Sequence, residues 1–197
     1  MTLRRSSISR EATYPTSEWR ENILSRRSFL LRMAGGSLAA LMPIGAQGGN
    51  SEELTEARRW QVLDAVQNHL FPSEPSSPGA RDIQALDYLR FVVRDNGLDV
   101  DERLFIFQGV GWLEDLTHKE IGRGFTELNE DERERMLRKV ASSTAGENWL
   151  STIQLYLVEA LLADPVYGGN PSGIGWKWLG HNPGFPRPTA QTRYGAT

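Results

Sequence analysis

ENWLSTIQLYLVEALLA, residues 147–163, is the most apolar helical segment of the chain. Its large apolar side chains nearly encircle a helix instead of forming the single stripe of an ordinary amphipathic helix. They are Trp149, Leu150, Ile153, Leu155, Tyr156, Leu157, Val158, Leu161 and Leu162. A helix of this kind lies at the centre of a bundle or is covered by a partner protein.

Four segments before it also have apolar residues at helical spacing. We expect helices over about 52–70, 80–95, 99–118 and 129–142. Strand signals are nearly absent, because no turn dipeptide is flanked by alternating β-branched residues. The sequence therefore predicts an all-α fold, a single helical domain of about five helices followed by a long irregular segment rich in Gly, Pro and aromatic residues.

Local signals mark two of the helix starts. Asp99 with Glu102, and Asn129 with Glu132, have the spacing of a capping box, in which the two side chains satisfy each other's backbone N–H groups. Inside the third helix, Gly109 and Gly111 each cost up to ~1 kcal/mol relative to Ala. We therefore expect either close helix packing or a break at these glycines.

The N-terminal 46 residues have the pattern of a twin-arginine export signal. The motif residues are Ser25, Arg26, Arg27, Phe29 and Leu30, and fourteen uncharged residues, 33–46, follow. That apolar stretch is shorter than the ~20 residues that a membrane-spanning helix needs. We expect residues 1–46 to be the signal, cut after about Ala46, residues 47–50 to be a linker, and residues 51–197 to be the helical domain, exported already folded to the periplasm.

Charge and composition exclude several classes of function. Residues 1–46 carry a net charge of +4 and residues 47–197 one of −7, and an acidic body repels nucleic acid. The chain has no cysteine, which excludes disulfides, covalently attached haem c and cysteine-ligated iron–sulfur clusters. Its three histidines lie far apart in the sequence, so we expect no metal site. No catalytic residue and no cofactor are predicted in this chain.

The segment after Asp164-Pro165 changes character. Glycine permits close backbone approach, proline favours extended backbone, and aromatic side chains supply large rigid contact areas. We expect this segment to lack regular structure and to bind a partner through Tyr167, Gly168, Gly169, Asn170, Gly173, Gly175, Trp176, Lys177 and Trp178. The alternative is that it folds back, so that its aromatic residues cap the domain's own core.

Together these segments resemble the gluconate 2-dehydrogenase subunit 3 family, the small subunits of FAD-dependent sugar and polyol dehydrogenases. The resemblance covers most of the chain. It rests on the Ser25 to Leu30 leader, on Phe71-Pro72 through Ser77-Pro78-Gly79-Ala80, on Gly124-Phe125-x-x-Leu128, and on Asp164-Pro165-x-Tyr167-Gly168-Gly169-Asn170-x-x-Gly173-x-Gly175-Trp176-Lys177. The last motif is the most specific of the four.

The resemblance implies a division of labour among three subunits. A large subunit binds FAD and oxidises the substrate, and a multihaem cytochrome c subunit carries electrons to the respiratory chain. The small subunit contributes the signal read by the twin-arginine translocase and stabilises the flavoprotein. The complex would then lie at the periplasmic face of the inner membrane, and its sugar or alcohol substrate stays open.

Two other functions remain as alternatives. The first is a stand-alone periplasmic enzyme acting on carbohydrate, with Asp164, Lys177 and His181 beside the aromatic segment. The second is a module that grips a sugar between Trp176 and Trp178. Neither alternative accounts for the whole set of matched segments.

Overall fold

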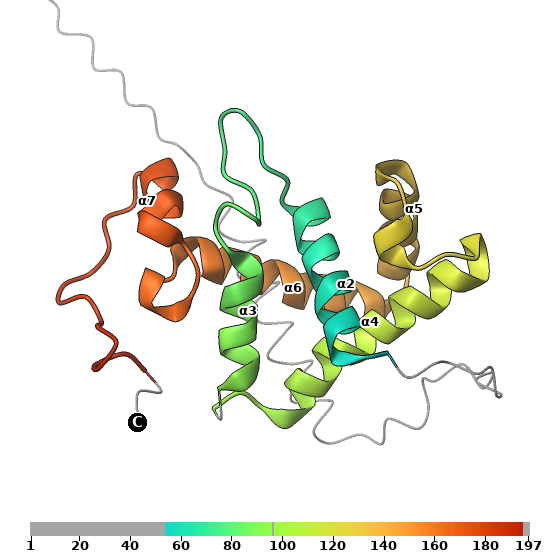
Figure 1. Cartoon of the computed structure of the whole chain (residues 1–197), viewed down its shortest axis with the longest axis horizontal. Helices are drawn as coiled ribbons and strands as arrows, with labels where there is room; N and C mark the ends of the chain where they lie inside the picture. The colour runs from blue at the N-terminus through green and yellow to red at the C-terminus, as the bar shows by residue number, and fades with distance from the viewer. Residues whose placement is uncertain (1–53, 96, 195–197) are drawn as a thin grey trace, which may run out of the picture. The chain divides into compact units, whose positions relative to one another are not determined.

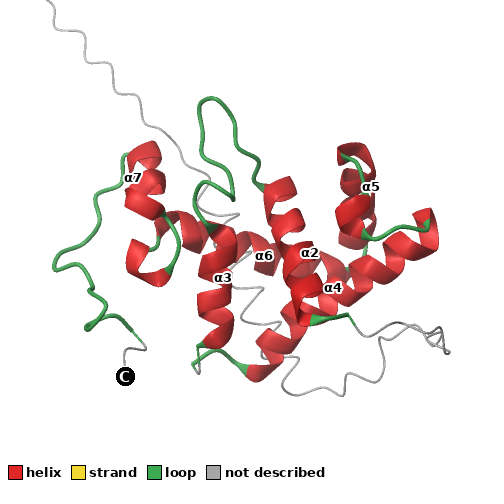
Figure 2. Ribbon diagram, in the orientation of Figure 1, coloured by secondary structure: helices red, strands yellow, loops and turns green. Residues whose placement is uncertain are grey.

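The computed structural model describes residues 54–95 and 97–194, and within these residues the secondary structure is helical, without strands (Figures 1 and 2). The α-helices are α2 (Glu56–Leu70), α3 (Ala85–Arg94), α4 (Val100–Ile121), α5 (Glu130–Ala141), α6 (Thr144–Leu162) and α7 (Ile174–Leu179). Three short 3-10 helices are η2 (Phe125–Glu127), η3 (Pro165–Tyr167) and η4 (Pro171–Gly173). The all-α prediction is confirmed.

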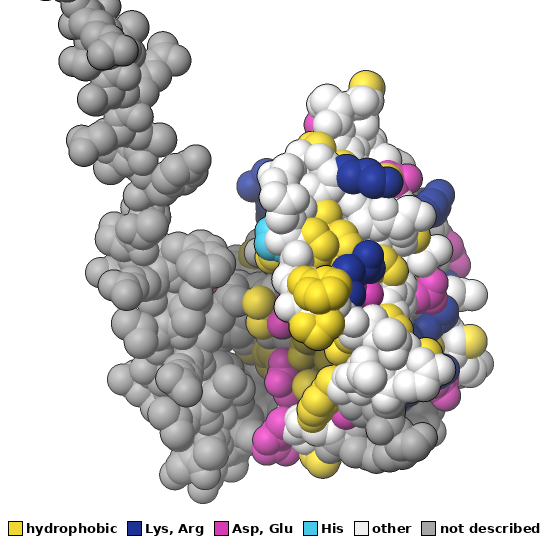
Figure 3. Space-filling model, turned by 90° about the vertical axis from the view of Figure 1, so that its left-hand side faces the viewer, with side chains coloured by type: hydrophobic (Ala, Val, Ile, Leu, Met, Phe, Trp, Pro, Cys, Tyr) yellow, Lys and Arg dark blue, Asp and Glu magenta, His cyan; other side chains and the backbone are white. Residues whose placement is uncertain are grey.

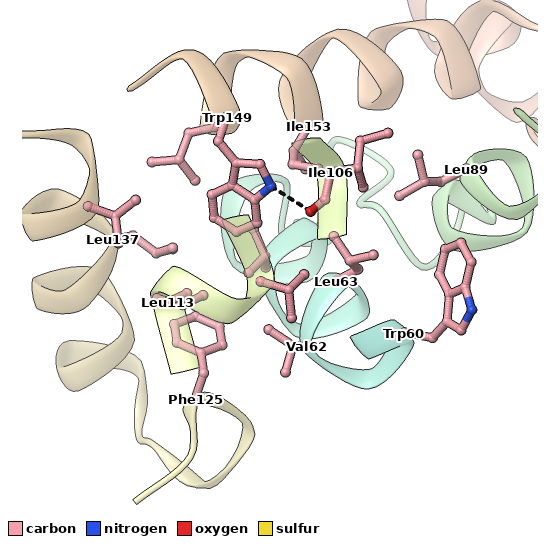
Figure 4. Close-up of a cluster of buried hydrophobic side chains, with 14 of the residues drawn as sticks. Trp60, Val62, Leu63, Leu89, Ile106, Leu113, Phe125, Leu137, Trp149 and Ile153 are labelled. Carbon is pink, nitrogen blue, oxygen red and sulfur yellow. Dashed lines mark hydrogen bonds between the residues drawn. The ribbon is translucent and has the colours of Figure 1, made fainter. Parts of the chain in front are cut away.

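Helix α6, which contains the apolar segment 147–163, packs against all the other α-helices named above. It passes behind α3 and α2 in the view of Figure 1. Its inward positions are buried and face the main core (Figure 4), whereas Leu155, Val158 and Leu162 on the opposite side remain 39%, 49% and 41% exposed. The helix is therefore central on one face and uncovered, within the described part of the chain, on the other.

The glycines of α4 do not break the helix, which runs without interruption to Ile121. A Cβ atom at Gly109 would overlap the indole ring of Trp149, while one at Gly111 would meet nothing within 4 Å. The Trp149 Nε1–H also donates to the Ile106 carbonyl at 2.9 Å (Figure 4). Of the two outcomes expected at these glycines, close helix packing is therefore the observed one, and it occurs at Gly109.

One of the two expected capping boxes forms. The Asn129 side chain accepts from the Glu132 N–H at 2.9 Å, and the Glu132 carboxylate accepts from the Asn129 N–H at 3.0 Å. The Asp99 side chain instead accepts from the Asp101 N–H at 2.7 Å. Glu102 does not complete a box there, and its carboxylate instead accepts a hydrogen bond from the Tyr156 hydroxyl at 2.6 Å.

Two helix starts differ from the expected ones. Helix α3 begins at Ala85 instead of at residue 80, because Gln84 has a left-handed backbone conformation with φ 52°. Helix α6 begins earlier, at Thr144, where the Ser143 side chain accepts from the Gly146 N–H at 3.1 Å. No helix within the described ranges is both long and apolar enough to cross a membrane.

The segment after Asp164 is more regular than the sequence predicts. It contains η3, η4 and the six-residue helix α7, so the expectation of no regular structure there is wrong. The left-handed conformations of Gly168 and Gly173, with φ 93° and 65°, make the turns between these short helices. Residues 181–194 do form loops and turns.

Candidate functional site

The predicted export residues cannot be located in the fold. Ser25, Arg26, Arg27, Phe29 and Leu30 all lie outside the described residues, as do the rest of the leader and the whole linker. Their role stays a prediction from the sequence. The structure bears instead on the nine predicted partner-binding residues between Tyr167 and Trp178.

Asn170 holds this segment to the helical domain. It is fully buried; its Nδ2 donates to the Ala163 carbonyl at 3.0 Å and its Oδ1 accepts from the Gly175 N–H at 2.7 Å. Its own N–H donates to the Ile83 carbonyl at 2.8 Å. One asparagine thus joins the end of α6, the start of α7 and the loop before α3. Asparagine suits the site because it tolerates the observed φ of 51° better than most residues.

Two glycines permit close contact between this segment and α6. A Cβ atom at Gly175 would overlap the Leu161 carbonyl oxygen, and one at Gly169 would lie 3.0 Å from the Ala160 carbonyl oxygen. Both glycines are buried. Side chains at either position would therefore push the segment away from the domain.

Trp176 completes the attachment. Its side chain is only 7% exposed, and its Nε1–H donates to the Leu162 carbonyl at 2.8 Å. The Arg187 guanidinium lies 4.8 Å from the centre of the Trp176 ring and its Nε donates to Asp164 at 2.8 Å. That hydrogen bond from Arg187 holds the pKa of the Asp164 carboxyl below its ordinary value.

The nine predicted residues therefore divide into two groups. Gly169, Asn170, Gly173, Gly175 and Trp176 are buried against the domain itself, in agreement with the fold-back alternative. Tyr167 and Gly168 are half-buried, and Lys177 and Trp178 are exposed, Trp178 by 43%. The Trp178 ring packs against the Phe71 ring in a tilted arrangement, with ring centres 6.3 Å apart. Partner binding by the more exposed members stays a prediction.

A shallow pocket of about 470 Å³ opens beside α7, at the end of the domain shown in Figure 3. On this face, hydrophobic side chains lie beside Lys and Arg side chains. The pocket is lined by Pro165, Ser172, Gly173, Trp176, Lys177, Gly180, His181, Asn182, Pro183 and Arg187. It is therefore a mixed apolar and basic site.

This geometry does not favour either alternative function. Lys177 and His181 line the pocket, but Asp164, the acid expected beside them, is held by Arg187. Trp176 and Trp178 are two residues apart on α7, so their side chains point about 200° apart and cannot enclose one sugar. Among the described residues there is also no group of three His, Asp or Glu side chains arranged to hold a metal ion.

A cluster of polar side chains that was not predicted from the sequence lies between α3, α4 and α6. The Tyr88 hydroxyl donates to Glu159 at 3.1 Å, and the Tyr156 hydroxyl donates to Glu102. Burial raises the pKa of Glu159 and of both tyrosines, and the nearby Glu102 charge raises that of Glu159 further. The signal in the sequence was Glu159, a lone acidic residue in the second half of the apolar segment 147–163.

Comparison with known proteins identifies the family. The family model described as gluconate 2-dehydrogenase subunit 3 matches residues 57–184, which run from the first turn of α2 through η3, η4 and α7 and include every pocket-lining residue except Arg187. Searches of curated proteins and of solved structures find no match. Because the family model spans well over half of the sequence, the chain belongs to the gluconate 2-dehydrogenase subunit 3 family.

Proposed function

We propose that this protein is a non-catalytic accessory subunit of an FAD-dependent sugar or alcohol dehydrogenase complex, which it stabilises and escorts through the twin-arginine translocase to the periplasm. Membership of a family of dehydrogenase subunits supports the complex. The leader with Arg26 and Arg27 supports the export role. The flavin would belong to the large subunit, and haem c to a cytochrome subunit, since this chain has no cysteine for covalent haem attachment.

The observation that carries this proposal is the side of α6 that the described part of the chain leaves uncovered. Leu155, Val158 and Leu162 follow one another along the helix at intervals of three and four residues, so they form one exposed aliphatic stripe. We call these three residues the outer stripe of α6. An aliphatic stripe on a central helix favours association with another protein, since it removes apolar surface from water.

The contact can be tested with charge substitutions. Leu155→Asp and Val158→Asp place a carboxylate within the outer stripe, and Gln108→Asp places the same charge on an exposed position of α4 as the control. Because all three positions are partly exposed, we expect the free energy of unfolding to change by less than about 1 kcal/mol. The first two variants should lose a co-expressed flavoprotein during purification, and Gln108→Asp should retain it.

The export role needs a separate experiment. Changing Arg26 and Arg27 together to Lys should leave the flavoprotein in the cytoplasm, because the translocase reads the arginine pair. Dehydrogenase activity is then measured in periplasmic and cytoplasmic fractions of cells that produce both subunits. Full periplasmic activity with the double variant would contradict the escort role.

A further inference from the structure

The part of the chain around the pocket differs in charge from the rest of the domain. Residues 51–163 carry a net charge of −9, with histidine counted as neutral, whereas residues 164–197 carry +2. All the basic residues of the pocket, Lys177, His181 and Arg187, come from this second part. The pocket is therefore the basic site of an otherwise acidic domain.

We propose that this pocket accepts a carboxylate of the partner subunit, supplied by an Asp or Glu side chain. This inference rests on the proposed function for the identity of the partner. The binding chemistry depends only on this chain, so it can be tested without the partner.

Several donors of the pocket are not used within the domain. Arg187 uses Nε for Asp164, while its two terminal nitrogens make no hydrogen bond within residues 54–95 and 97–194. Over the same ranges, Lys177 forms no ion pair and the Ser172 hydroxyl no hydrogen bond. A guanidinium edge, an ammonium group and a hydroxyl are the donors that a carboxylate oxygen accepts from.

The pocket suits a carboxylate better than a phosphate. The charges of Lys177 and Arg187, reduced by the bound Asp164, leave one positive charge when histidine is counted as neutral, which matches a singly charged carboxylate. Phosphate groups carry closer to two negative charges. Trp176 and two prolines supply an apolar wall, which suits the methylene groups of an Asp or Glu side chain.

The site is also held in place before any ligand binds. Trp176 is fixed by its bond to the Leu162 carbonyl, and Arg187 is fixed between the Trp176 ring and Asp164. A site fixed in advance loses less conformational entropy when the ligand binds.

Ligand titration of the full-length chain by NMR tests the inference. The probe is the N′-methylamide of N-acetyl-L-glutamate, whose side-chain carboxylate is its only charge, and the N′-methylamide of N-acetyl-L-glutamine is its uncharged counterpart. We expect saturable shifts of the Trp176 indole N–H and the Gly173 and Gly180 amides, with a dissociation constant on the order of 1–10 mM for one small anion. Lys177→Gln should weaken binding about fivefold, and Lys119→Gln, on an exposed position of α4, should not.

The outcomes separate the inference from its competitors. Equal shifts with the uncharged probe, tighter binding of inorganic phosphate, or equal effects of the two lysine variants would each overturn the carboxylate site. An unchanged Trp176 indole signal in Lys177→Gln without ligand shows that this variant keeps the local fold.

Co-expression then distinguishes this inference from the proposed function. If the flavoprotein fails to purify with the unmodified chain, the proposed function fails. If it purifies equally well with the unmodified chain and with Lys177→Gln, only the pocket inference fails. A loss confined to Lys177→Gln, with Lys119→Gln unaffected, supports the carboxylate contact.

Discussion

Gly109 and Gly111 lie two residues apart in α4, on nearly opposite sides of the helix, and should respond in opposite ways to replacement by Ala. A Cβ atom at Gly109 would overlap the ring of Trp149, whereas at Gly111 it would enter open space. Trp149 has no exposed surface, and its N–H is bound to the Ile106 carbonyl, so the ring cannot move aside without losing that bond. The two glycines therefore make a matched pair.

The expected magnitudes follow from two opposing effects. Ala in place of Gly stabilises a helix interior by up to ~1 kcal/mol. Overpacking a core costs ~1–3 kcal/mol, and the pinned Trp149 ring places Gly109→Ala near the upper end of that range. We therefore expect Gly109→Ala to lower the free energy of unfolding by about 2 kcal/mol, and Gly111→Ala to raise it by about 0.5–1 kcal/mol.

Urea unfolding of the two full-length variants, followed by circular dichroism at 222 nm, measures both values. Because the gain in helix propensity is common to both, the difference between the variants isolates the contact with Trp149. For a domain of this size, 2 kcal/mol corresponds to a melting temperature about 4–8 °C lower. If Gly109→Ala proved as stable as Gly111→Ala, the close packing of α4 against α6 would be refuted.

Three further predictions concern the stability of the domain. Asn170→Ala removes a buried side chain with two hydrogen bonds and should lower the free energy of unfolding by about 3 kcal/mol. Asn182 is exposed in the same segment, so Asn182→Ala should change the free energy of unfolding by less than about 0.5 kcal/mol. Equal losses for the two variants on thermal unfolding would contradict the anchoring role of Asn170. Asn129→Ala breaks the capping box of α5 and should cost about 1 kcal/mol in urea unfolding, and an unchanged midpoint would count against it. Burial raises the pKa of Glu159, so its stabilising contribution is present below the ordinary value of 4.5 and is lost as the pH rises through the folded-state pKa. As the pH rises, the unmodified chain should therefore lose stability relative to the Glu159→Gln variant. If the stabilities of the two proteins changed in parallel with pH, Glu159 would have no raised pKa in the folded state.

Features set by neighbours in the sequence were predictable. The helical periodicity predicted an all-α fold, and the Asn129 box depends only on residues three positions apart. The Asp99 box had the same local pattern, yet Glu102 bonds to Tyr156, 54 positions away, which no local pattern reveals. Long-range pairing therefore limited the prediction of this capping box.

The candidate site was predictable in its residues but not in its arrangement. The segment around Trp176 stood out because glycine and aromatic residues alternate there. Whether such a segment faces inward depends on matching groups elsewhere: the Leu162 carbonyl accepts from Trp176, and the Ile83 carbonyl accepts from the Asn170 N–H. Every residue has a backbone carbonyl group, so the sequence does not indicate which carbonyl groups will accept these hydrogen bonds.

The most direct test of the accessory role is the flavin content of the purified complex. The chain is tagged and co-expressed with the proposed flavoprotein partner, and FAD absorbance is measured per mole of chain after gel filtration. We predict an equimolar flavin content for the unmodified chain and for Gln108→Asp, and its loss with Leu155→Asp in the outer stripe of α6. An unmodified chain that elutes as a flavin-free monomer while the flavoprotein elutes separately would contradict the proposal.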